Sequence, residues 1–208
     1  MAGAFRAALE AAWTTLEGRD HSALAADAGV TVEKGMIMLD LLDQRCVICL
    51  EERRMSIEGE NVDEAVTILV LHYLVLASGT VPSGNLLSFR QLHGGAVYYA
   101  AFKSRVNDVL GELYRRHPAP LLQALDKMGA ERSGNSAFIL WVLPRLPVTL
   151  FLREGDEEVP GTATLLFDAT APLFLPVEDL AEAGTWVVDR LTRVTGDQLR
   201  PTNRPSSV

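Results

Sequence analysis

The segment between residues 65 and 77 constrains the fold most, because it carries no charged side chain and is apolar almost all round. Asn61 precedes it as a plausible N-cap, Glu64 supplies an acidic first turn and Gly79 follows its end, which predicts a helix over residues 61–78. A helix that is apolar on every side must be covered on every side. Since the run is too short to span a bilayer, we expect it to be the central helix of a water-soluble core.

Two strand-rich regions lie on either side of this helix. Short apolar runs separated by charged or glycine-containing turns predict a β-meander over residues 30–57 and further strands within residues 137–167. Helical periodicity predicts long helices over 95–116 and 177–194. We therefore predict an α+β fold, in which one antiparallel sheet from about 30–57 and 137–167 is covered by the helices at 61–78, 95–116 and 177–194.

The length and charge of the chain restrict its class. The 208 residues suit one domain, which we place at 1–196, and the tail 197–208 is rich in proline and small polar residues and is expected to be disordered. The net charge of −8 argues against nucleic acid as a partner. With only two cysteines and no apparent signal peptide or transmembrane segment, we expect a cytoplasmic protein that does not associate with membranes.

The two cysteines have the spacing of metal and redox sites, Cys46-Val47-Ile48-Cys49, but they fall within a predicted strand. Residues three apart in a strand point to opposite faces, so this run cannot aim both sulfurs at one ion. No two histidines have the i, i+4 spacing that chelates a metal on a helix. We predict no metal site, and both cysteines read as small buried hydrophobic residues.

The stretch from Ser88 to Tyr99 carries the densest group of candidate binding residues. It joins an extended run to a helix, and such a junction can present backbone N–H groups and polar side chains to a ligand. Its glycine pair fits neither a dinucleotide fingerprint nor a phosphate loop. The candidate ligand-binding residues here are Arg90, His93, Gly94, Gly95 and Tyr98.

Two further candidates come from outside this stretch. His72 lies in the apolar helix, where a histidine is either a hydrogen-bonded core residue or a ligand-facing group. Asp168 ends a strand, where a carboxylate either serves a function or holds the loop as an Asx-turn. We expect Arg90, Tyr98 and Asp168 to approach one another. The acidic turn 154–158 is expected to be solvated, with cation binding as the alternative.

Several of these segments together resemble the domain-of-unknown-function 3786 family. The resemblance rests on Leu71-His72-Tyr73-Leu74, Ser88-Phe89-Arg90, Gly94-Gly95, Tyr98, Leu143-Pro144-Arg145-Leu146-Pro147, Glu154-Gly155-Asp156-Glu157-Glu158, Leu166-Phe167-Asp168 and Leu175-Pro176-Val177-Glu178-Asp179-Leu180. The sequence departs from the family pattern at His93, where proline is expected, and at Phe174, where tyrosine is usual. The resemblance implies no established activity and no cofactor, so both remain unknown. Relatives occur largely in anaerobic bacteria and archaea, and some carry an additional four-cysteine iron–sulfur module, which we do not expect in this sequence.

Three functions remain open at this point. The first is a non-enzymatic accessory protein of anaerobic metabolism that binds a small molecule or cofactor, with a link to corrinoid or iron–sulfur proteins. The second is a hydrolase or transferase that uses Asp168 with His72 or Arg90, although the sequence has no Gly-x-Ser-x-Gly elbow to supply a nucleophile. The third is a protein–protein interaction module. The sequence does not fix the oligomeric state.

Overall fold

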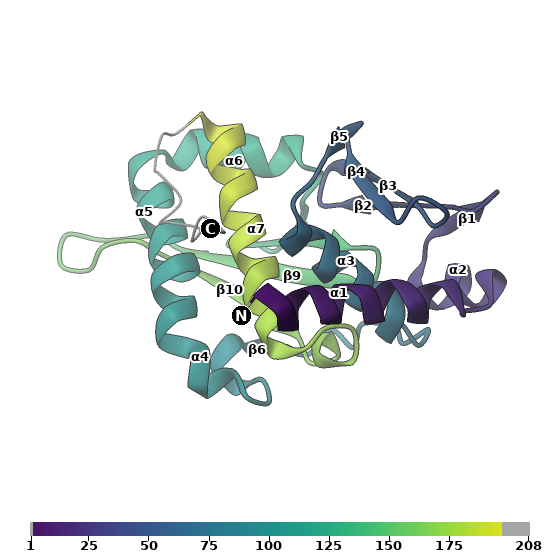
Figure 1. Cartoon of the computed structure of the whole chain (residues 1–208). Coiled ribbons are helices and arrows are strands. Elements are labelled where there is room, and N and C mark those ends of the chain that lie inside the picture. The colour runs from purple at the N-terminus through teal and green to yellow at the C-terminus, as the bar shows by residue number, and fades with distance from the viewer. Residues whose placement is uncertain (1, 197–208) are drawn as a thin grey trace.

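The computed structural model describes residues 2–196, and the tail whose disorder the sequence predicts lies outside them. Two helices open the chain and lead into a five-stranded antiparallel meander, which we call sheet A (Figure 1). Asp20 caps the second helix by accepting a hydrogen bond from the Ala23 N–H, and Gly29 ends it with a left-handed φ of 67°. The elements are α1 (Ala2–Glu17), α2 (His21–Ala28), β1 (Thr31–Glu33), β2 (Met36–Leu41), β3 (Gln44–Cys49), β4 (Arg54–Ile57) and β5 (Glu60–Asn61).

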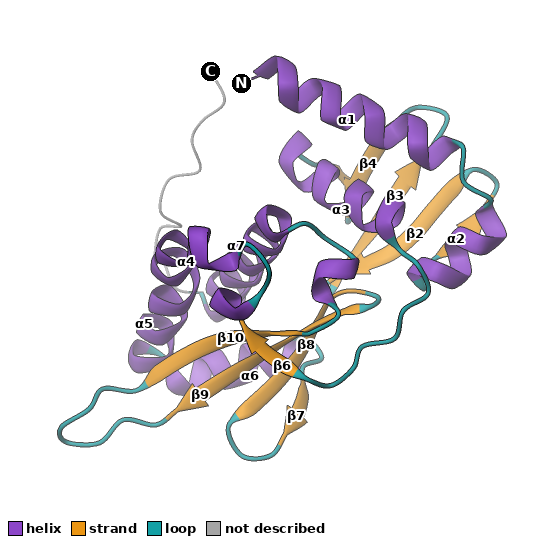
Figure 2. Ribbon diagram, turned by 90° about the horizontal axis from the view of Figure 1, so that it is seen from below, coloured by secondary structure: helices purple, strands orange, loops and turns teal. Residues whose placement is uncertain are grey.

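The rest of the chain builds a second antiparallel sheet, sheet B, with the strand order β6-β10-β9-β8-β7. Figure 2 shows α6 lying behind this sheet, while no helix crosses the side that faces the viewer. The elements are α3 (Glu64–Leu76), β6 (Leu86–Ser88), the 3-10 turn η1 (Phe89–Gln91), α4 (Gly95–Phe102), the π-helical turn η2 (Lys103–Asn107), α5 (Asp108–Arg116), α6 (Pro118–Lys127), β7 (Glu131–Ser133), β8 (Ala137–Leu143), β9 (Leu146–Arg153), β10 (Thr162–Asp168), the 3-10 turn η3 (Ala171–Leu173) and α7 (Val177–Thr195).

The α+β class is confirmed, but the strands form two sheets where the sequence suggested one. To join sheet B, sheet A would have to pair with the outer edge of β8, and β7 already occupies part of that edge. Strand β7 pairs with β8 as far as Ile139, and beyond that point the N–H of Leu42 donates to the Val142 carbonyl over 3.0 Å. The two sheets therefore touch through a backbone hydrogen bond at the end of β2 and do not merge into one ladder.

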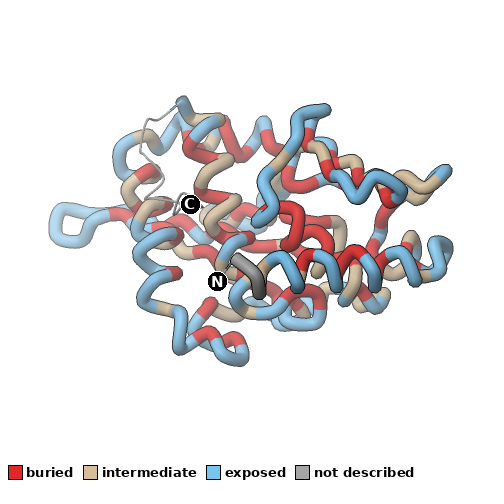
Figure 3. The backbone as a smooth tube through the Cα atoms, viewed as in Figure 1, coloured by how far each residue is buried: buried red, intermediate tan, exposed pale blue. Residues whose placement is uncertain are grey.

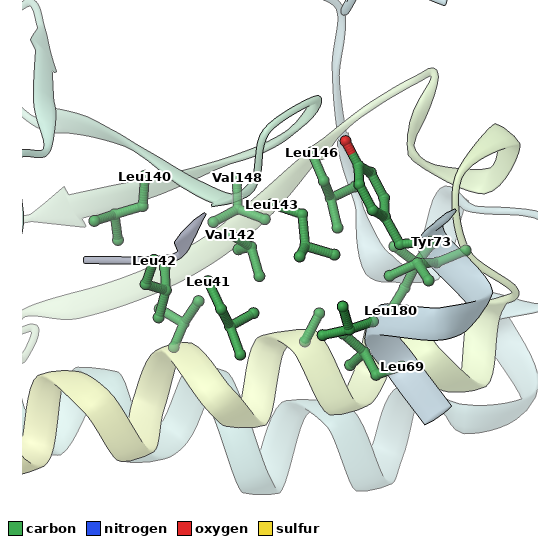
Figure 4. Packing of buried hydrophobic residues seen from close by; sticks show 14 of the residues in the cluster. Leu41, Leu42, Leu69, Tyr73, Leu140, Val142, Leu143, Leu146, Val148 and Leu180 are labelled. Atoms are coloured by element: carbon green, nitrogen blue, oxygen red, sulfur yellow. The ribbon is translucent and has the colours of Figure 1, made fainter. Parts of the chain in front are cut away.

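Helix α3 is the central helix that its composition predicts, with eight of its thirteen residues buried. Figure 3 shows buried backbone concentrated at the centre of the molecule and exposed backbone along the β9–β10 loop. In Figure 4, Leu140, Val142 and Val148 of sheet B point toward helix α7, and Leu41 of sheet A and Leu69 of α3 complete the same cluster.

Tyr73 on α3 is fully buried and connects the two halves of the structure. Its hydroxyl donates to the carbonyl of Ala28, just before sheet A, over 2.6 Å. The same oxygen accepts the N–H of Arg145, in the turn between β8 and β9, over 3.0 Å. Burial raises the pKa of the phenol well above its ordinary value, so the group stays protonated and can make both bonds.

Three local predictions needed correction. Asp63, not Asn61, caps α3. The predicted helix 95–116 is interrupted by the π-turn η2. This turn brings the Asn107 side chain to β10, where its amide oxygen accepts the Leu165 N–H over 3.0 Å. Leu165 lies just past the part of β10 that pairs with β6. The extended run, predicted over residues 86–92, ends at Ser88, because the Gln91 side chain accepts from both the N–H and the hydroxyl of Ser88 and closes a 3-10 turn.

Tyr73→Phe is expected to lower the free energy of unfolding by about 1–3 kcal/mol, because it strands the buried Ala28 carbonyl and the Arg145 N–H. Chemical denaturation would measure this change. Tyr114→Phe is the matched control, since Tyr114 is partly exposed and no hydrogen bond engages its hydroxyl among the described residues. Equal effects of the two variants would contradict the bridging role of Tyr73.

Candidate functional site

The first turn of α7 brings together side chains that are far apart in the sequence. The helix begins after Pro176, which offers no side-chain cap, and its first turn carries Glu178 and Asp179. Two carboxylates at this end offset the partial positive charge of the helix N-terminus. Each of them also reaches a different helix, Asp179 toward α3 and Glu178 toward α4.

His72 of α3 pairs with Asp179 through its Nδ1, which lies 2.5 Å from Oδ2 of the carboxylate. The hydrogen bond to Asp179 raises the pKa of the imidazole; burial opposes this, and the negative charge of Asp179 adds to it. The His72 side chain is 28% exposed, and no partner from residues 2–196 engages its Nε2. The pair therefore presents an oriented imidazole whose second nitrogen is open to a ligand or a proton.

Tyr98 and the glycine pair bring the start of α4 to the same place. The Tyr98 hydroxyl donates to Oε1 of Glu178 over 2.8 Å, and this bond raises the phenol pKa. Gly94 has a left-handed φ of 78°, and a β-carbon on it would lie 3.2 Å from Val177. A β-carbon on Gly95 would lie 1.9 Å from the Phe89 carbonyl, which no side chain tolerates. The glycines are thus needed for close packing of α4 against η1 and α7.

Arg90 and His93 lie on the segment that leads into α4, and both are exposed. The Arg90 guanidinium sits over the ring of Tyr99, with its carbon 5.8 Å from the ring centre. Because Arg90 lies in a 3-10 turn, the alternation of side chains along a strand does not set its direction.

Asp168 does not join this group, so the expected approach of Arg90 and Asp168 is wrong. Phe167 points toward the helices and contacts Phe89 and Phe102, so its neighbour Asp168 points to the opposite face of sheet B. There its carboxylate accepts hydrogen bonds from the N–H and hydroxyl groups of Ser83 and Thr170 and from the Gly84 N–H. Asp168 holds the loops at this end of the sheet, as the Asx-turn alternative predicts.

The remaining candidates behave as structural or solvated groups. Cys46 faces the core and Cys49 the opposite side of β3, which confirms the predicted alternation, and burial raises the pKa of the Cys46 thiol to about 12. Within residues 2–196, no three His, Cys, Asp or Glu side chains gather as a metal site requires. In the acidic turn, Asp156 accepts the N–H groups of Glu158 and Val159, and the turn is exposed.

The candidate site is therefore the group formed by His72, Tyr98, Glu178 and Asp179, and we call it the α3–α4–α7 cluster. The sequence pointed to His72, Gly94, Gly95 and Tyr98, but it assigned Glu178 and Asp179 only to the start of a helix. Their part in the site could have been suspected from their place in the segment 175–180, one of those that carry the resemblance described above.

The structure thus defines an α+β protein in which a partly exposed His–Asp pair lies where three helices meet. A family model, described as a domain of unknown function (DUF3786), matches residues 20–190, and the chain belongs to this family. Comparisons with curated proteins and with solved structures find no match. None of the helices in residues 2–196 is both long enough and apolar enough to cross a membrane.

Removing the Asp179 carboxylate is expected to lower the pKa of His72. A pKa raised by folding gives stability that is complete below the unfolded value, near 6.5, and that is lost as pH rises through the folded pKa. Asp179→Asn should therefore flatten the pH dependence of unfolding in that window. Proton NMR of the His72 ring would measure the pKa, with the exposed His21 as internal reference, and an unchanged His72 pKa would contradict the pairing.

Asp168→Asn is expected to destabilise the fold by about 1.5–3 kcal/mol, because an amide cannot accept all the hydrogen bonds that the carboxylate receives. Burial alone would raise the pKa of Asp168, but the bonds from Thr170, Ser83 and Gly84 outweigh it and hold the pKa below its ordinary value. The stability that Asp168 gives is therefore present above about pH 4 and is lost as pH falls through the lower, folded pKa.

Acid and denaturant titrations of the parent and Asp168→Asn would test this role. Asp156→Asn is the matched control, because Asp156 makes a similar turn in an exposed loop. A control as destabilising as Asp168→Asn would refute the special role of Asp168.

Proposed function

We propose that the protein is a non-enzymatic binding protein whose ligand is a small molecule with a carboxylate or a similar hydrogen-bond acceptor. The observation that carries this proposal is the His72–Asp179 pair, in which Nδ1 lies 2.5 Å from the carboxylate and the His72 side chain is still 28% exposed. An imidazole whose pKa is raised favours its charged form, and in that form Nε2 is a hydrogen-bond donor. A donor held in a fixed direction suits an anionic acceptor.

The surrounding charges are compatible with such a ligand. Asp179 is neutralised by the protonated imidazole, and the Glu178 carboxylate is occupied by the Tyr98 hydroxyl. Arg90, on the segment that enters α4, carries a further positive charge. Tyr98 is 41% exposed and is held by Glu178, the neighbour of Asp179 on α7.

A second candidate is an enzyme, a hydrolase or transferase, that uses His72 as a general base. A histidine oriented by a carboxylate at Nδ1 and free at Nε2 is the arrangement that abstracts protons in many active sites. The partners of Asp168 weigh against a catalytic role for that residue, so Asp179 takes its place as the carboxylate in this version. No nucleophile is assigned beside the pair, which is why binding is the preferred proposal.

The cellular setting rests on the sequence and the family resemblance. We propose a cytoplasmic protein of anaerobic metabolism, and a corrinoid or iron–sulfur protein as a partner is suggested by the resemblance alone. No cofactor is proposed.

Binding of a small carboxylate is expected to depend on the protonation of His72. Affinity should be highest below the folded pKa of His72 and fall as pH rises through it, because Nε2 then loses its proton. A panel of mono- and dicarboxylates and inorganic phosphate would be screened by NMR, with the His72 ring signals as reporter. Native mass spectrometry of freshly purified, anaerobically prepared protein would reveal any ligand retained.

The decisive variant is His72→Ala, which should abolish binding. His21→Gln is the control, because His21 is an exposed histidine on α2, and it should leave binding unchanged. If the panel gives no His72 response at any pH and no retained ligand is found, the binding proposal fails. Turnover of a bound ester or amide that is lost in His72→Ala would favour the enzyme.

A further inference from the structure

Figure 2 shows a face of sheet B that no helix covers. The residues on this face are unusually apolar for a surface open to solvent. An antiparallel sheet with one solvated face normally alternates apolar residues inward with polar residues outward. Here the inward positions of β8, β9 and β10 are buried as expected, but six of the eleven outward positions are also apolar. The other five are Thr149, Arg153, Thr162, Thr164 and Asp168. The apolar outward residues are Ala137, Ile139, Trp141, Pro147, Phe151 and Leu166, and we call them the outer patch.

The strand register makes the outer patch continuous. Ala137 lies opposite Phe151, and Trp141 lies opposite Pro147 on the neighbouring strand. Leu166 of β10 lies opposite Thr149, which in turn lies opposite Ile139. Side chains on one face of paired strands are within contact distance of one another, so these residues form one surface across three strands.

The largest side chains of the outer patch remain exposed. Trp141 is 39% exposed and Phe151 is 44% exposed, although both are large aromatic residues of the sheet. Trp141 is also held in place, because its indole N–H donates to Glu131 of β7 over 2.9 Å. Rigid, exposed aromatic residues are typical anchors of protein interfaces.

We propose that the outer patch is the contact surface of a homodimer, in which sheet B of one copy packs face to face on sheet B of another. Two sheets pack well when both have the same twist, and a second copy supplies a sheet of identical twist. A two-fold contact of this kind is isologous, so the same patch serves both copies.

Charge favours a second copy at this face over other faces of the molecule. The chain carries a net charge of −8, so most contacts between two copies set acidic surfaces against each other. The outer patch contains no charged residue. The charges at the margin of this face are Glu131 on β7, Arg153 on β9 and Asp168 at the end of β10, a net of one negative charge per copy against −8 for the whole chain.

The size of the face fits a reversible dimer. Strands about 4.8 Å apart that rise about 3.3 Å per residue give the 28 residues of sheet B a face of roughly 440 Å². Two such faces bury about 900 Å² in total, which is in the range of weak, transient interfaces. We therefore expect a dimer that dissociates at micromolar concentrations, about 1–100 µM.

Sedimentation velocity of the full chain between about 1 and 500 µM tests the proposal. The parent is expected to shift from monomer to dimer across this range, whereas Phe151→Glu should weaken the association at least tenfold, as loss of an anchor does. Val97→Glu is the control, because Val97 is 79% exposed on α4, away from sheet B, and should leave dimerisation unchanged.

Thr164→Lys provides a second disrupting variant in case Phe151→Glu fails to fold. Thr164 is opposite Phe151 on the same face, and its polar side chain makes it more tolerant of a charge. A parent that stays monomeric at 500 µM would overturn the proposal. The outer patch would then be a contact surface for a different protein. A dimer that survives both sheet variants and is lost in Val97→Glu would also overturn it.

Discussion

The hydroxyl of Tyr73 is the contact on which the arrangement of the two sheets depends. It donates to the Ala28 carbonyl before sheet A and accepts the N–H of Arg145 in the β8–β9 turn of sheet B. Both bonds lie in the core, where an unmade hydrogen bond is costly. Arg19 secures the same helix at its end by donating to the carbonyls of Leu74 and Ala77. Helix α3 is thus fixed by polar groups as well as by its apolar surface.

The α3–α4–α7 cluster depends on this arrangement, because His72 precedes Tyr73 on the same helix. With Tyr73 directed into the core, its neighbour is turned toward the edge of α3, where α7 begins. Glu178 and Asp179, in the first turn of α7, then have two effects. They offset the helix dipole, and they form hydrogen bonds with side chains from α3 and α4. A change at the start of α7 therefore alters the packing of three helices together with the ionisation of His72.

The two faces of sheet B have separate roles. The inner face joins α7 and α3 in one hydrophobic cluster. The outer face carries the outer patch at its centre and, at its end, Asp168, which organises the loops around Ser83 and Thr170. The ligand proposed for the α3–α4–α7 cluster and the second copy proposed for the outer patch therefore occupy different sides of the sheet. Neither proposal requires the other.

The sequence by itself determined most of the helices and strands, because their signals are local. The apolar run of α3 and the alternation around Cys46 each depend on residues only a few positions apart. It also pointed to His72, Tyr98 and the glycine pair as candidate site residues. Only the tertiary structure decided that the strands form two sheets, that Asp168 faces away from Arg90, and that His72 meets Asp179, 107 residues later in the chain. Which side chain pairs with another across such a separation is set by the packing of whole elements, and no local pattern in the sequence encodes it.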